Sequence, residues 1–341
     1  MAVPMKAVVI RRIAPIEESP LSYEDLPTPE PKGKDILIRV HACGICRTEL
    51  DEIEGRLKPR IPVIPGHQVV GRVVEMGAEA GRFSVGDRVG VAWIYSSCGV
   101  CRFCRRGLEN LCENFMGTGC DADGGYAEYM IVNEDYAYKI PTIFSDVEAA
   151  PLLCAGAIGY RALKLTGIED GDVIGLYGFG SSAHIVFQLV RYLYPNSKIF
   201  VFTKRRGDPP SQLAAKMGAD WIGETGEKPP LKLNCAIDTT PTGIPVREAL
   251  GNLERGGRLV MNLIRKETPI TDLDYTLHLW WEKEIKSVAN ITRRDVAEFL
   301  EVAAKIPIKP EVVEFRIEEA NEALKMLKYG AYRGSGVLVI K

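Results

Sequence analysis

Four cysteines within fifteen residues constrain the fold of this chain more than any other feature of its sequence. They follow the spacing C-x2-C-x2-C-x7-C and are Cys98, Cys101, Cys104 and Cys112. Four thiolates on one short segment can close a tetrahedral shell around a zinc ion, and such a shell leaves no position open for a substrate. The spacing therefore predicts a small lobe over residues 95–115 that binds a structural zinc ion.

Two other uses of these cysteines stay open at this point. Disulfides are typical of exported proteins, but the first twelve residues lack the apolar stretch of a secretory signal, and the nine cysteines are an odd number. An iron–sulfur cluster takes similar ligands, although the ferredoxin spacings differ from this one. We favour zinc, and reduced cysteines without an export signal lead us to expect a cytoplasmic protein.

Length and charge narrow the class of protein further. A chain of 341 residues is long for one hydrophobic core and suggests two domains. Its net charge of −2 gives no reason to expect binding to nucleic acid or to an anionic membrane surface. No apolar run approaches the roughly 18 residues that a membrane-spanning helix needs. We therefore expect a globular protein whose partners are small molecules.

The pattern of secondary structure changes after Pro141. Before it, short segments rich in β-branched residues and bounded by Gly and Pro predict an irregular β-barrel, with strands at 7–11, 35–42, 69–76, 88–92 and 126–132. After it, a helix at 146–165 and alternating strands and helices predict an α/β domain with a doubly wound parallel sheet. We expect a β-rich catalytic domain from residues 1–147 and 290–341, and a dinucleotide-binding domain at 148–289.

A dinucleotide site is expected where the strand at 172–177 meets the next helix. The sequence there is G-x-G-x-x-A, the fingerprint of a Rossmann turn in its usual context. The first glycine permits a tight turn, the second lets the backbone approach a pyrophosphate, and the small third residue allows close packing of helix on strand. Free N–H groups and the helix dipole favour the phosphates. The candidate residues are Gly178, Phe179, Gly180, Ser181, Ser182 and Ala183.

The end of the next strand bears on the choice between NAD and NADP. An NAD site usually has an acidic residue there for the ribose hydroxyls, whereas this strand ends at Thr203 and is followed by Lys204, Arg205 and Arg206. Cations beside a 2′-phosphate are what NADP requires. A solvated basic turn is the alternative, and we favour NADP(H) over NAD(H).

Three further segments offer ligands for a second metal. Cys46 follows a predicted strand, His67 sits in a Gly/Pro turn, and Cys154 lies within the predicted helix at 146–165. Two cysteines and one histidine leave a fourth position for water or substrate, which is the pattern of a catalytic zinc. Each residue alone is weak evidence, because a lone cysteine often behaves as a small hydrophobic residue.

Five motifs follow one another along the chain: residues 44–49 (GICRTE), 65–68 (PGHQ), the four-cysteine lobe, 151–156 (PLLCAG) and 178–184 (GFGSSAH). In this order they resemble the motifs of the zinc-dependent alcohol dehydrogenases of the medium-chain dehydrogenase/reductase family. The resemblance covers essentially the whole chain and is greatest to the bacterial and archaeal branch. It implies a GroES-like catalytic domain, a Rossmann domain, two zinc ions per chain, and a homodimer or homotetramer. It assigns Cys46, His67 and Cys154 to the catalytic zinc, and to Thr48 the hydroxyl that bonds the substrate oxygen.

Three residues depart from the family pattern. Glu49 stands where Asp is usual, and its longer side chain can still orient the ligand histidine. Gln68 replaces a Glu near the metal, which removes a negative charge. Asp51 replaces a His that ends the proton relay in many members, so either Asp51 or bulk water would take the proton. Trp93 lies where relatives line the substrate pocket, and core packing is an equal reading of it.

The sequence thus predicts an enzyme that transfers a hydride between a primary or secondary alcohol and NAD(P), with zinc as a Lewis acid. A polyol or sugar dehydrogenase of the same family is the alternative, although such substrates ask for a more polar pocket than Trp93 suggests. A non-catalytic protein that binds zinc and a dinucleotide is a third reading. The physiological alcohol and the preferred direction do not follow from the sequence.

Overall fold

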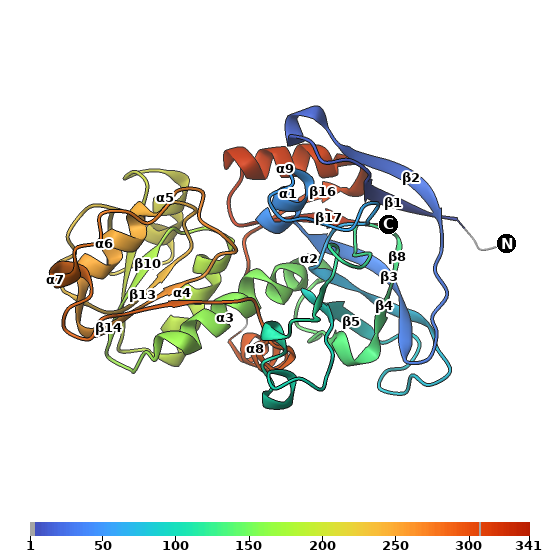
Figure 1. Ribbon diagram of the computed structural model, residues 1–341, viewed down its shortest axis with the longest axis horizontal. Helices are drawn as coiled ribbons and strands as arrows, with labels where there is room; N and C mark the ends of the chain where they lie inside the picture. The colour runs from blue at the N-terminus through green and yellow to red at the C-terminus, as the bar shows by residue number, and fades with distance from the viewer. Residues whose placement is uncertain (1–3, 307) are drawn as a thin grey trace. The chain divides into compact units, whose positions relative to one another are not determined.

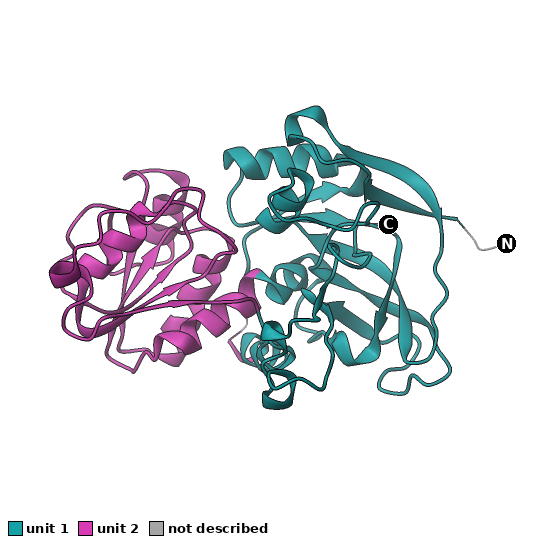
Figure 2. Cartoon of the chain, in the orientation of Figure 1, with its two compact units in different colours: residues 1–154, 291–304, 309–341 teal, residues 155–290, 305–308 magenta. Residues whose placement is uncertain are grey.

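The computed structural model describes residues 4–306 and 308–341. The chain divides into two compact units (Figure 2). Unit 1 comprises Met1–Cys154, Ile291–Ala304 and Lys309–Lys341, and unit 2 comprises Ala155–Asn290 and Lys305–Ile308. The break after Cys154 falls a little later than the expected domain boundary at residue 147, and nearly all of the last fifty residues belong to unit 1.

Unit 1 is built on a seven-stranded, mostly antiparallel sheet (Figure 1). Several strands of the unit contain runs of consecutive buried residues, and their apolar side chains contribute to one large core. A separate antiparallel ribbon and a two-stranded pair at the cysteine lobe complete the β structure. The sheet order is β16 (Val312–Arg316), β17 (Ser335–Val339), β3 (Asp35–Gly44), β4 (Val69–Met76), β5 (Arg88–Val91) and β9 (Ala137–Lys139), with β8 (Tyr129–Asn133) also on β3; the ribbon is β1 (Pro4–Ile10) with β2 (Leu21–Pro27), and the pair is β6 (Ile94–Ser96) with β7 (Met116–Gly117).

The helix predicted at 146–165 is not continuous, and the prediction is wrong in the segment that ends at Cys154. A short helix α2 (Asp146–Ala149) passes into a 3-10 turn (Ala150–Leu153) that has a proline in its first turn. Cys154 then leaves the helical region, with φ −129° and ψ −76°, and α3 (Ala155–Thr166) begins directly after it. Pro151 has no N–H to donate and its ring crowds the preceding turn, which accounts for the end of α2 at Ala149. Cys154 lies outside both helices.

Three further helices belong wholly or mainly to unit 1. They are α1 (Arg47–Ile53), α8 (Arg293–Lys305) and α9 (Ala320–Tyr329). Helix α1 buries every residue from Thr48 to Ile53, including three carboxylates. A helix so short and so acidic at its buried face is not a packing element alone, and its polar side chains need partners in the interior.

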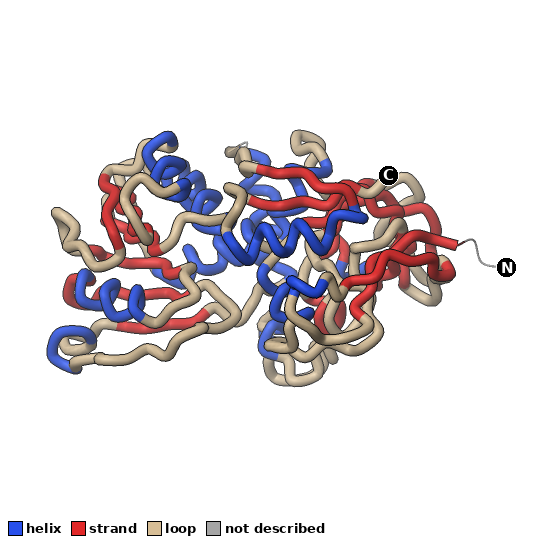
Figure 3. Tube along the Cα trace, turned by 90° about the horizontal axis from the view of Figure 1, so that it is seen from above, coloured by secondary structure: helices blue, strands red, loops and turns tan. Residues whose placement is uncertain are grey.

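Unit 2 contains a six-stranded parallel sheet, and Figure 3 shows helices on both sides of its strands. This is the doubly wound architecture that the alternating pattern predicts. Strand β10 and helix α4 flank the Gly-rich turn. The sheet order is β12 (Trp221–Glu224), β11 (Lys198–Thr203), β10 (Val173–Tyr177), β13 (Leu233–Asp238), β14 (Leu253–Met261) and β15 (Glu284–Ser287); the helices are α3, α4 (Ser181–Leu193), α5 (Pro209–Lys216), α6 (Ile244–Asn252) and α7 (Tyr275–His278).

Two further observations concern membrane-spanning helices and the cysteines. Within residues 4–306 and 308–341, no helix combines the length and the apolar character needed to cross a membrane. All nine cysteines are free thiols, and seven of them gather in two clusters.

Candidate metal centres and dinucleotide site

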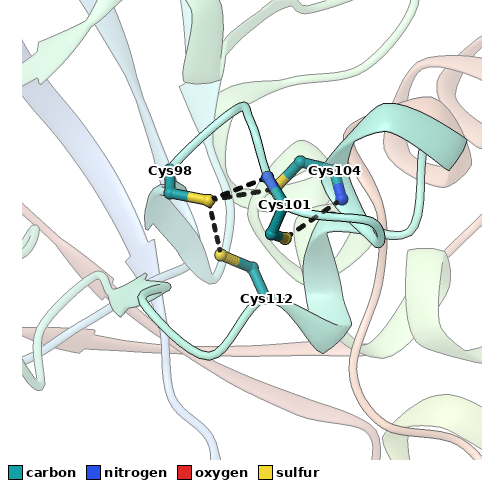
Figure 4. A group of neighbouring side chains, drawn as sticks. All are labelled: Cys98, Cys101, Cys104 and Cys112. Carbon is teal, nitrogen blue, oxygen red and sulfur yellow. Dashed lines mark hydrogen bonds between the residues drawn. The ribbon is translucent and has the colours of Figure 1, made fainter.

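The cysteine lobe brings its four sulfur atoms together (Figure 4). Cys98 Sγ lies 3.5 Å from Cys112 Sγ and 3.9 Å from Cys104 Sγ. The tight turns between the cysteines aim backbone N–H groups at sulfur, since Cys101 N donates to Cys98 Sγ and Cys104 N to Cys101 Sγ, both at 3.4 Å. Tetrahedral zinc–thiolate bonds of about 2.3 Å need sulfur–sulfur separations near 3.8 Å, so the cluster fits zinc.

The same turns adjust the acidity of the lobe. Hydrogen bonds from the backbone of Val100 and Cys101 lower the pKa of Cys98 to about 6. A thiolate is the form that binds metal, and backbone donors favour it over the thiol. The effect differs between the cysteines, since burial raises the pKa of Cys104 to about 11.

Both ends of the lobe are held by a distant part of unit 1. Glu109, buried between the third and fourth cysteines, accepts hydrogen bonds from the backbone N (2.7 Å) and Nε (3.3 Å) of Arg293 at the start of α8. The Arg293 guanidinium stacks 5.1 Å from the centre of the Tyr136 ring. The Tyr136 hydroxyl accepts from the backbone N of Ser97, next to the first cysteine. This network fixes the lobe to the rest of the unit.

The second cluster joins Cys46, His67 and Cys154, and it lies wholly within unit 1. One ligand atom from each residue lies within 4.8 Å of the others. Cys46 is the N-cap of α1, His67 lies two residues before the first residue of β4, and Cys154 sits in the break before α3. The structure thus gathers the three residues that the sequence proposed, and a Cys2His set leaves a fourth zinc position open.

Charges around this cluster prepare it for a cation. His67 Nδ1 lies 2.6 Å from Glu49 Oε1, which leaves Nε2 as its metal-binding nitrogen. Hydrogen bonding from Cys154, together with nearby His67, holds the pKa of Cys46 well below that of an ordinary thiol, although burial opposes this. Burial alone lowers the pKa of His67, but the facing Glu49 carboxylate and Cys46 outweigh it and raise that pKa. Hydrogen bonding with Cys46, followed by burial, raises the pKa of Cys154. A cation such as Zn²⁺ would displace the protons of this cluster when it binds.

Glu52 is a buried acid near this site that sequence reasoning missed. Its side chain is 1% exposed, and neither carboxylate oxygen has a hydrogen-bond partner. Burial, followed by the charges of Glu49 and Cys46, raises the pKa of Glu52 well above the usual value and so favours the neutral carboxyl group. The spacing offered a signal, because Glu49 and Glu52 are three residues apart and so lie on one helical face.

The remaining candidates surround the open cluster. The Thr48 hydroxyl lies 3.5 Å from Cys46 Sγ and is buried. Asp51 is buried as well, and its carboxylate accepts a 2.5 Å hydrogen bond from Arg56 Nε. The Trp93 ring packs edge-on against His67, with 5.1 Å between ring centres, and is 6% exposed. Trp93 therefore packs in the core and touches the metal ligand at the same time.

The Gly-rich turn of unit 2 has the geometry of a phosphate-binding loop. Gly178 has φ +81°, and its N donates to the Phe202 carbonyl at 2.8 Å, tying the ends of β10 and β11 together. Gly180 is the N-cap of α4, and no atom lies within 4 Å of where its β-carbon would be. Ala183 is buried, and the Phe179 ring packs against Phe187. The open space beside Gly180 at a helix N-terminus is where an anion would approach.

The last residue of β11 and the three residues that follow it differ in their hydrogen bonds and ion pairs. Thr203 is buried and its hydroxyl donates to the Arg205 carbonyl at 3.1 Å. Lys204, Arg205 and Arg206 are exposed, but the Arg206 guanidinium forms a two-point ion pair with Glu227. Arg206 thus has a protein partner for its charge, and Lys204 and Arg205 are the cations best able to serve a ligand.

Oxidoreductases that use a nicotinamide dinucleotide and an open zinc site combine these features, and this is the class that fold and site define. A family model described as the alcohol dehydrogenase GroES-like domain matches residues 32–142. The chain is 44% identical to a probable alcohol dehydrogenase, AdhA, of Mycobacterium tuberculosis (98% of this chain, 97% of the relative) and 34% identical to an alcohol dehydrogenase of Geobacillus stearothermophilus (99% of each). The fold matches a thermostable alcohol dehydrogenase of Pyrobaculum aerophilum, solved with cobalt and zinc, with a TM-score of 0.88 at 24% identity, covering 99% of this chain and 100% of that one.

Identity above 40% over almost the full length of both chains decides the family. The chain belongs to the zinc-dependent alcohol dehydrogenases of the medium-chain dehydrogenase/reductase family. The resemblance drawn from its motifs is confirmed, as is the pairing of a GroES-like domain with a Rossmann domain.

Proposed function

We propose that this chain is an NAD(P)-dependent alcohol dehydrogenase and aldehyde reductase that acts on primary or secondary alcohols. The observation that carries the proposal is the Cys46–His67–Cys154 cluster, whose three ligand atoms converge and leave one coordination position for substrate. Zinc bound there supplies a Lewis acid that polarises the substrate oxygen and lowers its pKa, and the dinucleotide accepts or gives the hydride.

The chain's own residues hold and orient the reacting groups. Two thiolates and a neutral imidazole balance the charge of a divalent ion, and Glu49 fixes the ring of His67 so that Nε2 faces the sulfur atoms. The Thr48 hydroxyl, next to Cys46, is placed to exchange a proton with the substrate oxygen. We propose a second zinc ion in the four-cysteine lobe, with a purely structural role.

We propose Asp51 as the next proton acceptor after Thr48. Both residues lie on the buried face of α1. The Asp51 carboxylate, which forms an ion pair with Arg56 Nε, would receive the proton that leaves Thr48. Asp51→Asn should therefore change the pH profile of alcohol oxidation, and an unchanged profile would remove Asp51 from the path.

We propose NADP(H) as the preferred dinucleotide. The support is the absence of an acid directly after β11 in the sequence, together with the exposed cations Lys204 and Arg205. Charge-assisted hydrogen bonds to a 2′-phosphate are stronger than the neutral bonds that a ribose hydroxyl can make.

The two units would divide the work, with residues of unit 1 holding the metals and unit 2 the dinucleotide. We also propose a homodimer or homotetramer. Strand β15 is an edge of the parallel sheet, with Ile285, Trp280, Trp281 and Leu277 exposed on and before it. Exposed edges and apolar clusters of this kind favour pairing with another chain. The free cysteines support a reducing compartment such as the cytoplasm.

The position of Trp93 supports a preference for alcohols with aromatic or medium aliphatic groups over polyols. Its large apolar ring lies directly beside the ligand His67, and a polyol would ask for hydrogen-bonding partners there. Its burial also fits a packing role, so its effect on substrate choice is a proposal that Trp93→Ala would test.

Initial rates on zinc-loaded protein test the proposed function. A panel of alcohols and aldehydes is offered with NAD(H) and with NADP(H), and Cys46→Ser is measured in parallel. Aldehyde-dependent NADPH oxidation that vanishes in Cys46→Ser is the expected result. Turnover that persists in the variant at the wild-type rate would refute the role of this cluster.

A further inference from the structure

Ser182 lies in the turn expected to bind the dinucleotide, yet its hydroxyl is engaged by the protein on both sides. It donates to the Ala155 carbonyl at 2.8 Å and accepts from Asn262 Nδ2 at 2.9 Å. A serine that served only as a phosphate ligand would not need two fixed protein partners. The Ser182 hydroxyl therefore links two parts of the protein, one at Asn262 and one at Ala155.

Asn262 fixes one end of this chain of hydrogen bonds. It follows β14 directly and is 6% exposed, and its backbone N donates to the Asp238 carbonyl at 2.8 Å, at the end of β13. The backbone of Asn262 is thus held at the carboxyl ends of β13 and β14, and its side-chain amide extends from there to Ser182 Oγ. A donor fixed in this way sets the rotation of the Ser182 hydroxyl, because that hydroxyl has a single proton and gives it to Ala155.

Ala155 is the other end, and it is covalently joined to the metal ligand Cys154. It begins α3 directly after Cys154, whose own N donates a long 3.4 Å hydrogen bond to the Pro151 carbonyl. The contact of α3 with α4 is tight, since a β-carbon on Gly159 would lie 2.8 Å from Ser182 Oγ and 2.7 Å from Val186 Cγ2. Movement of the first turn of α4 must then reach the start of α3.

We infer that Ser182 is a positioning residue that couples the dinucleotide turn to the ligand Cys154 through the Ala155 carbonyl. The inference rests on the proposed function. Phosphates that settle on the N-terminus of α4 bias the position of Ser182, and the Ser182–Ala155 bond passes that bias to the residue next to the metal ligand. Coupling between two sites is reciprocal, so metal in the open cluster strengthens dinucleotide binding, by roughly fivefold or more.

Cobalt substitution gives a readout that a merely structural serine would not move. Co²⁺ replaces zinc in the open cluster, and the spectrum of Cys46→Ser loaded in the same way is subtracted to remove the contribution of the lobe. In the wild type, saturating NADP⁺ (or NAD⁺, whichever binds more tightly) should shift the thiolate-to-cobalt absorption. Ser182→Ala should still bind cobalt and dinucleotide but lose the shift.

Two variants of Asn262 separate the hydrogen bond from packing. Asn262→Asp offers the Ser182 hydroxyl a carboxylate acceptor, turns its proton away from Ala155 and should abolish the shift with the serine still present. Asn262→Ala leaves the Ser182–Ala155 bond possible and should keep the shift. A full shift in both Ser182→Ala and Asn262→Asp would overturn the inference. A wild type that fails to bind cobalt at the open cluster or to bind either dinucleotide would instead overturn the proposed function.

Discussion

Replacing Gly180 with alanine should leave the fold intact and weaken dinucleotide binding. The backbone of Gly180 has φ −101° and ψ −153°, which alanine adopts, and no heavy atom lies within 4 Å of the new β-carbon. A glycine-to-alanine change at such a position stabilises a protein by about 0.4–1 kcal/mol. The methyl group would instead occupy the space expected for the pyrophosphate. Loss of one charge-assisted hydrogen bond, about 1.5–3 kcal/mol, raises Kd roughly tenfold to hundredfold.

Gly178→Ala is the matched control, because this change should lower the free energy of unfolding. Its φ of +81° disfavours alanine by about 1–2 kcal/mol. Its β-carbon would lie 2.7 Å from Thr239 Oγ1, and such crowding costs about 1–3 kcal/mol more. Urea unfolding and NADPH fluorescence titration measure the two effects. If Gly180→Ala binds NADPH as tightly as the wild type, or is destabilised as much as Gly178→Ala, the account of this turn is wrong.

Three further substitutions test separate parts of the account. Arg205→Ala should raise the KM for NADP about tenfold or more and leave that for NAD nearly unchanged, whereas Arg206→Ala should do little because Glu227 already pairs with Arg206; equal effects of the two variants on KM would refute this. Glu52→Gln should become progressively more stable than the wild type in urea unfolding as pH rises from 4 to 7. The reason is that the pKa of Glu52 is raised in the folded state, so the stabilising contribution of Glu52 is complete below the unfolded pKa and is lost as pH rises, by about 1.4 kcal/mol per pKa unit. A difference in unfolding free energy between variant and wild type that stays constant with pH would contradict this. Glu109→Gln should lower the free energy of unfolding by about 1.5–3 kcal/mol and speed zinc release from the lobe to a chelator, while the exposed neighbour Glu113→Gln should change neither; zinc release at the wild-type rate in Glu109→Gln would show that the Arg293 contact does not hold the lobe.

Local sequence patterns predicted much of the fold. Strand β4 has the bounds that its sequence predicts, and β11 ends at Thr203 as expected. The strand–turn–helix around Gly178 could be recognised because each of its positions has a distinct backbone requirement. The clustering of Cys46, His67 and Cys154 was suggested by family motifs and not by spacing. Nothing local shows that residues so far apart in sequence meet.

What the sequence could not supply are contacts that only the folded chain creates. The bond between Glu109 and Arg293 joins residues 184 positions apart. The ion pair of Arg206 with Glu227 changes which cation can serve a 2′-phosphate, although all three basic residues look alike in the sequence. The break before Cys154 was missed because helical periodicity continues through Pro151, and the steric effect of the proline outweighed that pattern.

Zinc content measured together with turnover tests the central claim most directly. Wild-type protein and Cys154→Ser are prepared in parallel, their zinc is counted per chain, and aldehyde-dependent NADPH oxidation is measured on the same samples. The account predicts two zinc ions and turnover in the wild type, against one zinc ion and no turnover in Cys154→Ser. A variant that keeps two zinc ions, or that turns over at the wild-type rate with one, would contradict the assignment of Cys154 to a catalytic metal.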